Sequence, residues 1–415
     1  MASVLRENFQ QLTRKQRNAF VACFLGWSLD AFDFFLLTFC ISAIAVDFSI
    51  GVKQVAECLF WTLAMRPVGA LLFGAMAERW GRKPTLMLNV ISFAALELAS
   101  AFAPSFRWLI ISRALFGIAM GGEWGVGAAL AFETLPAKGR GFFSGLLQEG
   151  YVCGNLLAAA VYWLVFPHLH GTGWMTNWRV MFMIGALPAL LVFYIRVGVD
   201  ESPAWQQGKT GAVRPSLGWA QIVSYLPSFL FLIVLMTAFT AFSHGTQDLY
   251  PTFLEKTKGF ASANVGKIVI VANLGALMGG ICFGTLSESL GRRRAIVIAA
   301  LLAIPMIPLW AYSHTMVMLM VGGFLMQFMV QGAWGVIPAH LNELAPAAVR
   351  ATFPGLAYQL GNLISSRNAV FQAGLAARYG GLTIVMAGTV VICALFVAVM
   401  TALGREKKGE SMKAV

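Results

Sequence analysis

The sequence predicts an all-α membrane protein in which twelve transmembrane helices form two six-helix bundles related by pseudo-twofold symmetry. Of its 415 residues, 58% are hydrophobic and only 12% are charged, a balance that could not keep the surface of a soluble domain hydrated. Twelve apolar runs are each long enough to cross a bilayer, which takes about 20 residues. A sequence pattern also recurs at a constant offset of 210 positions, which indicates two related halves.

The expected spans follow one another with mostly short connections. They lie near residues 20–46, 54–77, 85–103, 107–133, 142–166, 178–196, 223–250, 262–286, 294–312, 316–342, 352–377 and 382–404. The one long polar interval is rich in Gly, Pro and charged residues and divides the spans six and six. We therefore expect an N-terminal bundle in residues 1–196, a cytoplasmic linker in 197–219 and a C-terminal bundle in 220–415.

The distribution of Lys and Arg predicts the orientation in the membrane. If the N-terminus is cytoplasmic, the inner connections hold twelve Lys and Arg residues and the outer connections hold seven. Cytoplasmic loops carry the excess of cations, so both termini are expected in the cytoplasm and the protein in the plasma (inner) membrane. The first twenty residues are polar and basic, with no apolar segment before a cleavage site, so no secretory signal is expected.

The net charge of +12 does not indicate a nucleic-acid partner, because the cations stand in short clusters between apolar runs, as topology signals do. The six cysteines are scattered and form no C-x-x-C pair, so neither a metal site nor a disulfide framework is expected. No cofactor motif is present, and the P-loop pattern of ATP-driven transport is absent.

The repeat is clearest in the loops after spans 2 and 8. "GAMAERWGRKP" begins at Gly74 and "GTLSESLGRRR" begins at Gly284. At the same offset Trp124 matches Trp334, Glu133 matches Glu343 and Arg140 matches Arg350. Two duplicated halves related by an axis along the membrane normal can rock around a central site.

Span 7 carries polar residues in the stretch "TAFTAFSHGTQDLYPTF" from Thr237 to Phe253. Their spacing of three and four residues puts Thr240, His244, Gln247, Asp248 and Pro251 on one helix face. An ionised Asp at mid-bilayer costs about 2.5–3.5 kcal/mol, so this face either lines an aqueous cavity or is a helix end that reaches outside water. His and Asp four residues apart can exchange a proton.

Arg66 lies inside span 2, followed by Pro67. A guanidinium keeps its charge and offers a fork of donors that fits a carboxylate. Arg66 could instead pair with an intramembrane acid such as Asp30, Asp33 or Glu149. Asp30 and Asp33, three residues apart on span 1, are candidates for proton uptake or for holding Arg66.

Other charged residues inside the spans are open to a functional or a structural interpretation. Glu97, Arg113, Glu123 and Glu149 can be mutually paired packing ions, and packing is favoured for them. Arg367 in span 11 is a second possible carboxylate anchor.

The paired G-x-x-x-[DE]-x-x-G-R-[RK] loops resemble the signature of the major facilitator superfamily, and the resemblance covers nearly the whole chain. "RPVGALLFGAMAERWGRK" and "GGEWGVGAALAFE" resemble its organic-acid proton symporter branches. The span-7 stretch is similar to the motif N-x-x-[S/T]-H-x-[S/T]-Q-D-x-x-x-T of the fungal lactate/pyruvate proton symporters, whose family also holds bacterial sialic acid permeases. Thr240 stands where that motif has Asn.

The residues and the resemblance together give a set of expected site residues. We expect the substrate-binding residues to be Arg66, Thr240, His244, Gln247, Gln359 and Asn362. We expect proton coupling by Asp30, Asp33, His244 and Asp248. The expected gating residues are Gly74, Glu78, Gly81, Arg82, Glu288, Gly291 and Arg292.

The expected function is therefore proton-coupled symport of a small monocarboxylate, such as lactate, pyruvate or a short-chain acid, by a monomer in the lipid bilayer. A sialic acid or other organic-acid proton symporter is the alternative within this class. A transporter-like receptor would need an added signalling domain, for which both tails are too short. A membrane enzyme would need a nucleophile–base set or metal ligands, and neither H-E-x-x-H nor a Cys/His cluster occurs.

Overall fold

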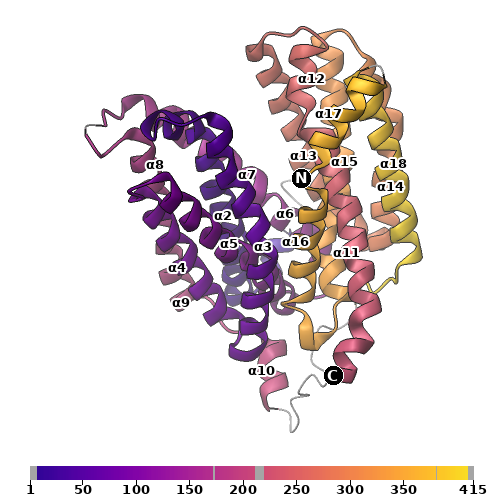
Figure 1. Ribbon diagram of the computed structural model, residues 1–415. Coiled ribbons are helices and arrows are strands. Elements are labelled where there is room, and N and C mark those ends of the chain that lie inside the picture. Colours follow the sequence, from indigo (N-terminus) through magenta and orange to yellow (C-terminus); the bar gives the residue numbers. More distant parts are fainter. Residues whose placement is uncertain (1–6, 172, 211–218, 380, 410–415) are drawn as a thin grey trace.

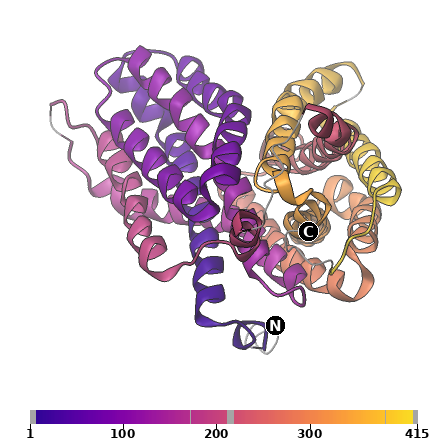
Figure 2. The same ribbon diagram turned by 90° about the horizontal axis from the view of Figure 1, so that it is seen from below.

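The computed structural model describes residues 7–171, 173–210, 219–379 and 381–409, and within these ranges it contains helices and connections but no strand. The helices stand in two groups, α2–α9 and α11–α18, which lie side by side (Figure 1). Seen along the helices, the two groups meet along one inner edge (Figure 2). The expected linker contains residues 211–218, which lie outside the described residues.

The N-terminal group contains eight described helices and two short 3-10 turns, and the helix α10 follows it. Their bounds are α2 (Arg14–Asp47), α3 (Val52–Trp80), α4 (Arg82–Ala101), α5 (Phe106–Thr134), α6 (Arg140–Gln148), α7 (Gly150–Val165), η1 (Phe166–His168), α8 (Asn177–Gly185), η2 (Leu187–Leu190), α9 (Leu191–Gly198) and α10 (Pro203–Thr210).

The C-terminal group has the same plan. Its elements are α11 (Trp219–Gln247), α12 (Tyr250–Lys256), α13 (Ser262–Leu290), α14 (Arg292–Ala303), η3 (Ile304–Met306), η4 (Pro308–Tyr312), α15 (Met316–Leu344), η5 (Ala347–Val349), α16 (Phe353–Ser365), α17 (Asn368–Arg378) and α18 (Leu382–Leu403).

Ten helical stretches of the described chain are long and apolar enough to cross a membrane. The other two expected spans are interrupted: span 6 is built from α8, η2 and α9, and span 11 from α16 and α17. None of these pieces alone reaches the roughly 20 residues that a crossing needs. Counted with the ten, they complete the twelve predicted spans.

The two groups pack most closely near the end that carries α10, which we call the linker end. There α6 lies against α13, and a methyl group added to Gly145 would overlap the backbone of Gly280. In a second contact between the two groups α5 approaches α16, where the Cα atoms of Gly125 and Gly355 face each other. Only glycine permits such close approach of two helix backbones. Away from this end the ribbons diverge, toward α8 in one group and α12 in the other (Figure 1).

Candidate functional site

The C-terminal group supplies the His–Asp pair expected from span 7. His244 lies in the last turn of α11, and its Nδ1 is 3.1 Å from Oδ1 of Asp248. The two side chains are 41% and 39% exposed. Asp248 stands just beyond Gln247, the last residue of α11, so the pair belongs to the end of that helix while keeping access to open space.

Neighbouring polar residues of α11 are held by α15. Gln247 donates from Nε2 to Oε1 of Gln327 at 2.8 Å, and Gln327 donates in turn to the Thr246 hydroxyl at 3.2 Å. Gln331 donates to the Ser243 hydroxyl at 3.2 Å. These bonds fix the face of α11 that carries the His–Asp pair.

Thr240 is turned toward α16 and is buried, with 1% of its surface exposed. Its hydroxyl lies 2.6 Å from the Ser365 hydroxyl and 3.1 Å from the Gly361 carbonyl oxygen. Thr240 thus joins α11 to α16 with its hydrogen-bonding capacity already in use.

Gln359 and Asn362 lie together on α16. Nδ2 of Asn362 is 3.5 Å from Oε1 of Gln359, and the Asn362 side chain lies near His244. The Nε2 group of Gln359 is buried and has no hydrogen-bond partner among the described residues, which leaves an amide donor for a ligand or water.

The N-terminal group supplies Arg66, which lies in α3 and is 4% exposed. Its Nε and Nη2 groups are buried and have no hydrogen-bond partner, and no ion pair involving Arg66 occurs among the described residues. Its charge acts on Asp30 in the same group and on His244 in the opposite group. Arg66 is therefore a cation between the two groups with two donors unused.

Asp30 and Asp33 are fully buried in α2, and their carboxylate oxygens have no hydrogen-bond partners in the residues that the structure describes. Asp30 interacts electrostatically with Arg66 and Arg113, whereas Asp33 interacts with Glu97 and Arg113. The structure thus brings both aspartates into one buried charge cluster of the N-terminal group.

Among the charges left open between packing and function, Glu97 and Arg113 form a buried ion pair. The Arg113 guanidinium also lies 3.9 Å from the ring centroid of Phe116, a cation–π contact that holds it in place. In the described ranges neither carboxylate oxygen of Glu123 has a hydrogen-bond partner, and Glu123 interacts electrostatically with Asp30 and Arg66. Arg367 is exposed at the break between α16 and α17.

Aromatic rings from both groups meet at the centre of the molecule. The rings of Trp124 and Tyr358, from opposite groups, lie 4.9 Å apart, and Trp334 lies 5.6 Å from Tyr358. Trp27 contacts Tyr151 at 5.8 Å. The polar side chains of the site therefore stand beside an apolar aromatic layer.

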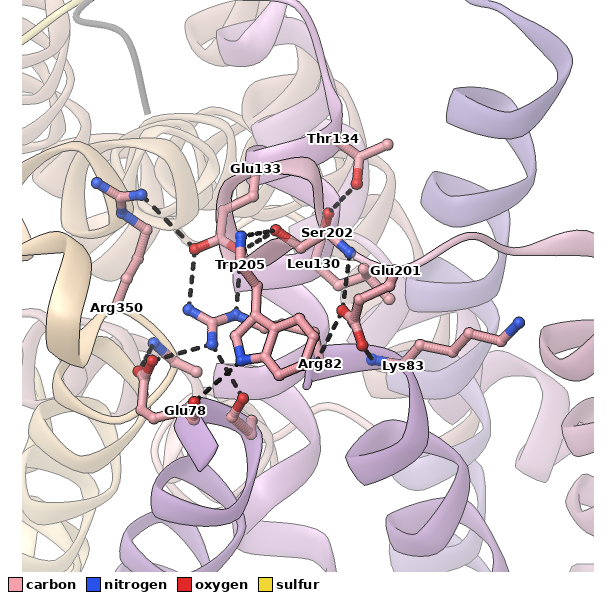
Figure 3. A network of polar contacts seen from close by, with 12 residues as sticks. Glu78, Arg82, Lys83, Leu130, Glu133, Thr134, Glu201, Ser202, Trp205 and Arg350 are labelled. Atoms are coloured by element: carbon pink, nitrogen blue, oxygen red, sulfur yellow. Dashed lines mark hydrogen bonds and ion pairs between the residues drawn. The ribbon is translucent and has the colours of Figure 1, made fainter. Parts of the chain in front are cut away.

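At the linker end, Glu78 connects the two groups (Figure 3). Its Oε1 accepts a hydrogen bond from the backbone N–H of Ala351 at 2.7 Å, and its other oxygen pairs with Arg82 at 3.0 Å. Arg82 also makes two hydrogen bonds to Glu133, at 3.0 and 3.1 Å. Arg350 of the C-terminal group approaches the same Glu133 carboxylate at 3.6 Å.

The second half repeats this arrangement. Glu288 accepts a hydrogen bond from the backbone N–H of Gly141 and pairs with Arg292 at 2.9 Å. Arg292 makes two hydrogen bonds to Glu343, at 3.1 and 3.0 Å, and the charge of Arg140 acts on Glu343. Each contact is the counterpart, 210 positions away, of one made by Glu78, Arg82 and Glu133.

The glycines of the two loops serve the backbone. Gly81 and Gly291 adopt φ values of 113° and 93° in the tight turns between α3 and α4 and between α13 and α14, which a residue with a Cβ rarely adopts. Gly74 faces Thr352 so closely that a methyl group would overlap it.

The residues that tie the linker to this network were not predicted from the sequence. The Glu201 carboxylate accepts hydrogen bonds from the backbone N–H groups of Arg82 and Lys83, at 2.9 and 3.2 Å. Ser202 donates from its hydroxyl to Glu133 at 2.5 Å, and the Trp205 indole donates to the Glu78 carbonyl at 3.0 Å. Burial raises the pKa of Glu201, while these backbone N–H bonds oppose the shift.

Glu406, after α18, repeats this contact in the second half by accepting from the backbone N–H groups of Arg292 and Arg293. A signal existed for the first contact, because "DESPAW" places an acid and a hydroxyl before an aromatic residue in an otherwise polar linker. No comparable string surrounds Glu406. Within the described residues, no cluster of His, Cys, Asp and Glu could hold a metal ion.

Known proteins similar to this chain are transporters. A carboxylic acid transporter protein homolog of Saccharomyces cerevisiae is 30% identical over 89% of this chain, which spans 63% of that protein's length. A probable 4-methylmuconolactone transporter of Cupriavidus pinatubonensis is 29% identical, covering 88% of this chain and 85% of that protein. The sialic acid transporter NanX of Escherichia coli is 28% identical, covering 85% of each.

Among solved structures, the proton:xylose symporter XylE bound to 6-bromo-6-deoxy-D-glucose superposes with a TM-score of 0.76 at 19% identity. The match covers 96% of this chain and 98% of the other, and it shows a shared fold. The family model described as "Major Facilitator Superfamily" matches residues 23–366 of this chain. The chain therefore belongs to the Major Facilitator Superfamily of membrane transporters.

Proposed function

We propose that this protein is a proton-coupled symporter that imports a small monocarboxylate, such as lactate, pyruvate or a short-chain acid. The observation that carries the proposal is Arg66, a buried cation in one bundle with two donors unused among the described residues. The opposite bundle supplies His244, which lies within electrostatic reach of Arg66 and contacts Asp248 at 3.1 Å. A carboxylate bound by Arg66 would thus lie near a pair that can exchange a proton.

Substrate binding would use both bundles. The Arg66 fork suits one carboxylate, and the free amide of Gln359, with Asn362 and His244 beside it, suits a carbonyl or hydroxyl next to that carboxylate. Gln247 is exposed at the same helix end and completes the set. Thr240 is left out of the proposed site because α16 already occupies its hydroxyl.

Proton coupling would use His244 and Asp248, which are in hydrogen-bond contact and accessible. Asp30 and Asp33 form a second candidate set, since Asp30 interacts with the proposed substrate cation Arg66. One proton carried with one anion makes the cycle electroneutral, so a pH gradient alone can drive accumulation.

Alternating access would follow from opening and closing the linker end. Glu78, Arg82, Glu288 and Arg292 would form the gate, with Gly74, Gly81 and Gly291 supporting its backbone. In this proposal the linker end faces the cytoplasm, as do both termini, and the transporter works as a monomer in the inner membrane.

A direct test of the substrate class is an uptake screen with purified protein in proteoliposomes and a panel of labelled acids. Uptake of short monocarboxylates, absent from liposomes without protein, supports the proposal. The runner-up is transport of sialic acid or another organic acid. It is favoured by relatives that are described as transporters of such compounds. Uptake of these acids without any short monocarboxylate would replace the proposal with the runner-up.

A further inference from the structure

Glu149 is a buried carboxyl group that the proposed cycle does not yet use. It is 2% exposed, and neither carboxylate oxygen has a hydrogen-bond partner within the described part of the chain. It stands at the junction between α6 and α7, with no cap hydrogen bond from its side chain to α7. An ionised carboxylate in such surroundings is strongly disfavoured relative to the neutral acid.

The position of Glu149 makes it part of the contact between the two bundles. A methyl group added to Gly280 of α13 would overlap Oε1 of Glu149. One helical turn before Glu149, Gly145 meets the Gly280 backbone in the same contact. Any motion that separates α6 from α13 therefore uncovers the Glu149 carboxyl.

Among the described residues no cation compensates a charge on Glu149, because it forms no ion pair and no cation acts on it in the closed arrangement. The helices α2, α13 and α15 pack against α6 and α7. The titratable side chains in residues 23–40 of α2 and in α13 and α15 are Cys23, Asp30, Asp33, Cys40, Lys267, Cys282, Glu288, His340 and Glu343. None of them hydrogen-bonds Glu149, and on its own helix Cys153 is the titratable group that interacts with it.

The repeat shows that this carboxyl belongs to one half only. The positions equivalent to Glu149 and Gly280, at the offset of 210, are Gln359 and Ala70. The second half thus has a neutral amide where the first has an acid. The missing methyl group at Gly280 is what leaves room for the carboxyl.

We infer that Glu149 is a protonation-controlled latch: the bundles can meet at the linker end only when Glu149 carries its proton. When α6 parts from α13, the carboxyl is wetted and releases its proton to water on that side. Before the bundles close again, it takes a proton back from the same water. No net proton crosses the membrane by this route, which separates Glu149 from the proposed coupling groups His244 and Asp248.

The inference rests on the proposed function only in that access alternates through separation of the bundles at the linker end. Its consequence is that return to the closed state slows as the pH at that side rises. One linked proton changes the ratio of closed to open protein by up to about tenfold per pH unit.

The test measures opening without any substrate, so it is independent of the substrate assignment. Ser144 is buried and accepts a hydrogen bond from Ala339 across the bundle contact, so Ser144→Cys reports opening in a background with the six native cysteines replaced. The purified protein in lipid nanodiscs is treated with N-ethylmaleimide at several pH values, with rates corrected for thiol ionisation on an unfolded reference peptide. Labelling should rise with pH when Glu149 is present, and should be slow and independent of pH with Glu149→Gln.

Glu57→Gln, which removes an exposed carboxyl on α3, is the matched control and should keep the pH dependence. The inference is overturned if Glu149→Gln keeps the profile of the parent, or if the parent shows no pH dependence.

A second pair of variants tests the contact itself. Gly280→Ala should displace the carboxyl and increase labelling several-fold, and adding Glu149→Ala should restore slow labelling because the overlap disappears. Equal labelling of Gly280→Ala with and without Glu149→Ala contradicts the inference.

Discussion

The Glu78 carboxylate accepts a hydrogen bond from the backbone N–H of Ala351, 2.7 Å away in the opposite bundle. Ala351 lies just before α16, in a segment that also contains Arg350, and Arg350 approaches Glu133 of the first bundle. The Gly141 N–H and Glu288 form the symmetry-related contact. A closed linker end is thus held by two equivalent carboxylate–backbone bonds rather than by apolar packing alone.

Replacing Glu78 with Gln is expected to weaken the closed linker end. A bond to a charged acceptor is replaced by a bond to a neutral one, a loss of about 1 kcal/mol or roughly a fivefold change in population. Transport should slow, and the population of the state that is open at the linker end should rise. Substrate binding should be retained. Cysteine accessibility at the linker end measures the shift, and Glu288→Gln should act in the same direction. Unchanged accessibility in both variants would argue against the gate.

Replacing Glu201 with Gln tests the linker contact through its pH dependence. Burial raises the pKa of Glu201 above its ordinary value of 4.5, so the contribution of this group to stability is full below that value and is lost as pH rises through the raised pKa. On going from neutral to acid pH, the wild type should therefore gain thermal stability relative to Glu201→Gln. Melting temperatures of both proteins, measured across this pH range, test this prediction. If the difference between the two melting temperatures does not change with pH, the role given to burial of Glu201 is contradicted.

Replacing Asp248 with Asn should uncouple transport from the proton. The hydrogen bond to His244 can survive, but a neutral amide cannot bind and release a proton. We expect loss of pH-driven accumulation while exchange of labelled for unlabelled substrate continues. If the variant still concentrates substrate at acid outside pH, the proton site lies elsewhere, with Asp30 and Asp33 as the next groups to replace.

Replacing Arg66 with Lys should weaken binding of every transported acid, because an ammonium lacks the planar fork of the guanidinium. A loss of one charge-assisted bond predicts about a tenfold lower affinity, or roughly 1.4 kcal/mol. Competition against labelled lactate measures it: pyruvate, acetate and propionate should compete with the wild type, and succinate should not. Succinate would leave its second carboxylate unpaired. Equal competition in wild type and variant would remove Arg66 from the substrate site.

Much of the architecture follows from the sequence because hydropathy and the 210-residue offset are properties of the chain alone. The same offset predicts that Glu78 and Glu288 act as equivalents. It does not predict Glu149 against Gly280, because that contact has no charged counterpart in the other half. Nor does hydropathy reveal the breaks inside spans 6 and 11, since an interrupted helix and a continuous one can have the same apolar composition.

The side-chain directions were the least predictable part of the site. Thr240 shares a helix face with His244 by spacing, yet its hydroxyl is taken by Ser365 and Gly361 of the neighbouring helix. Helical periodicity defines a face, but the packing partner decides which residues of that face meet a ligand. Glu201 was missed for a related reason: a carboxylate that caps a distant helix leaves no periodic signal.

Accumulation driven only by a pH gradient is the measurement that tests the central claim most directly. Wild-type protein in proteoliposomes, acid outside and with the membrane potential clamped at zero, should concentrate a labelled short monocarboxylate above its outside level. A protonophore should abolish that accumulation, and Asp248→Asn should show only equilibration. Equilibration by the wild type, with no response to the pH gradient or to the protonophore, would contradict proton-coupled monocarboxylate symport.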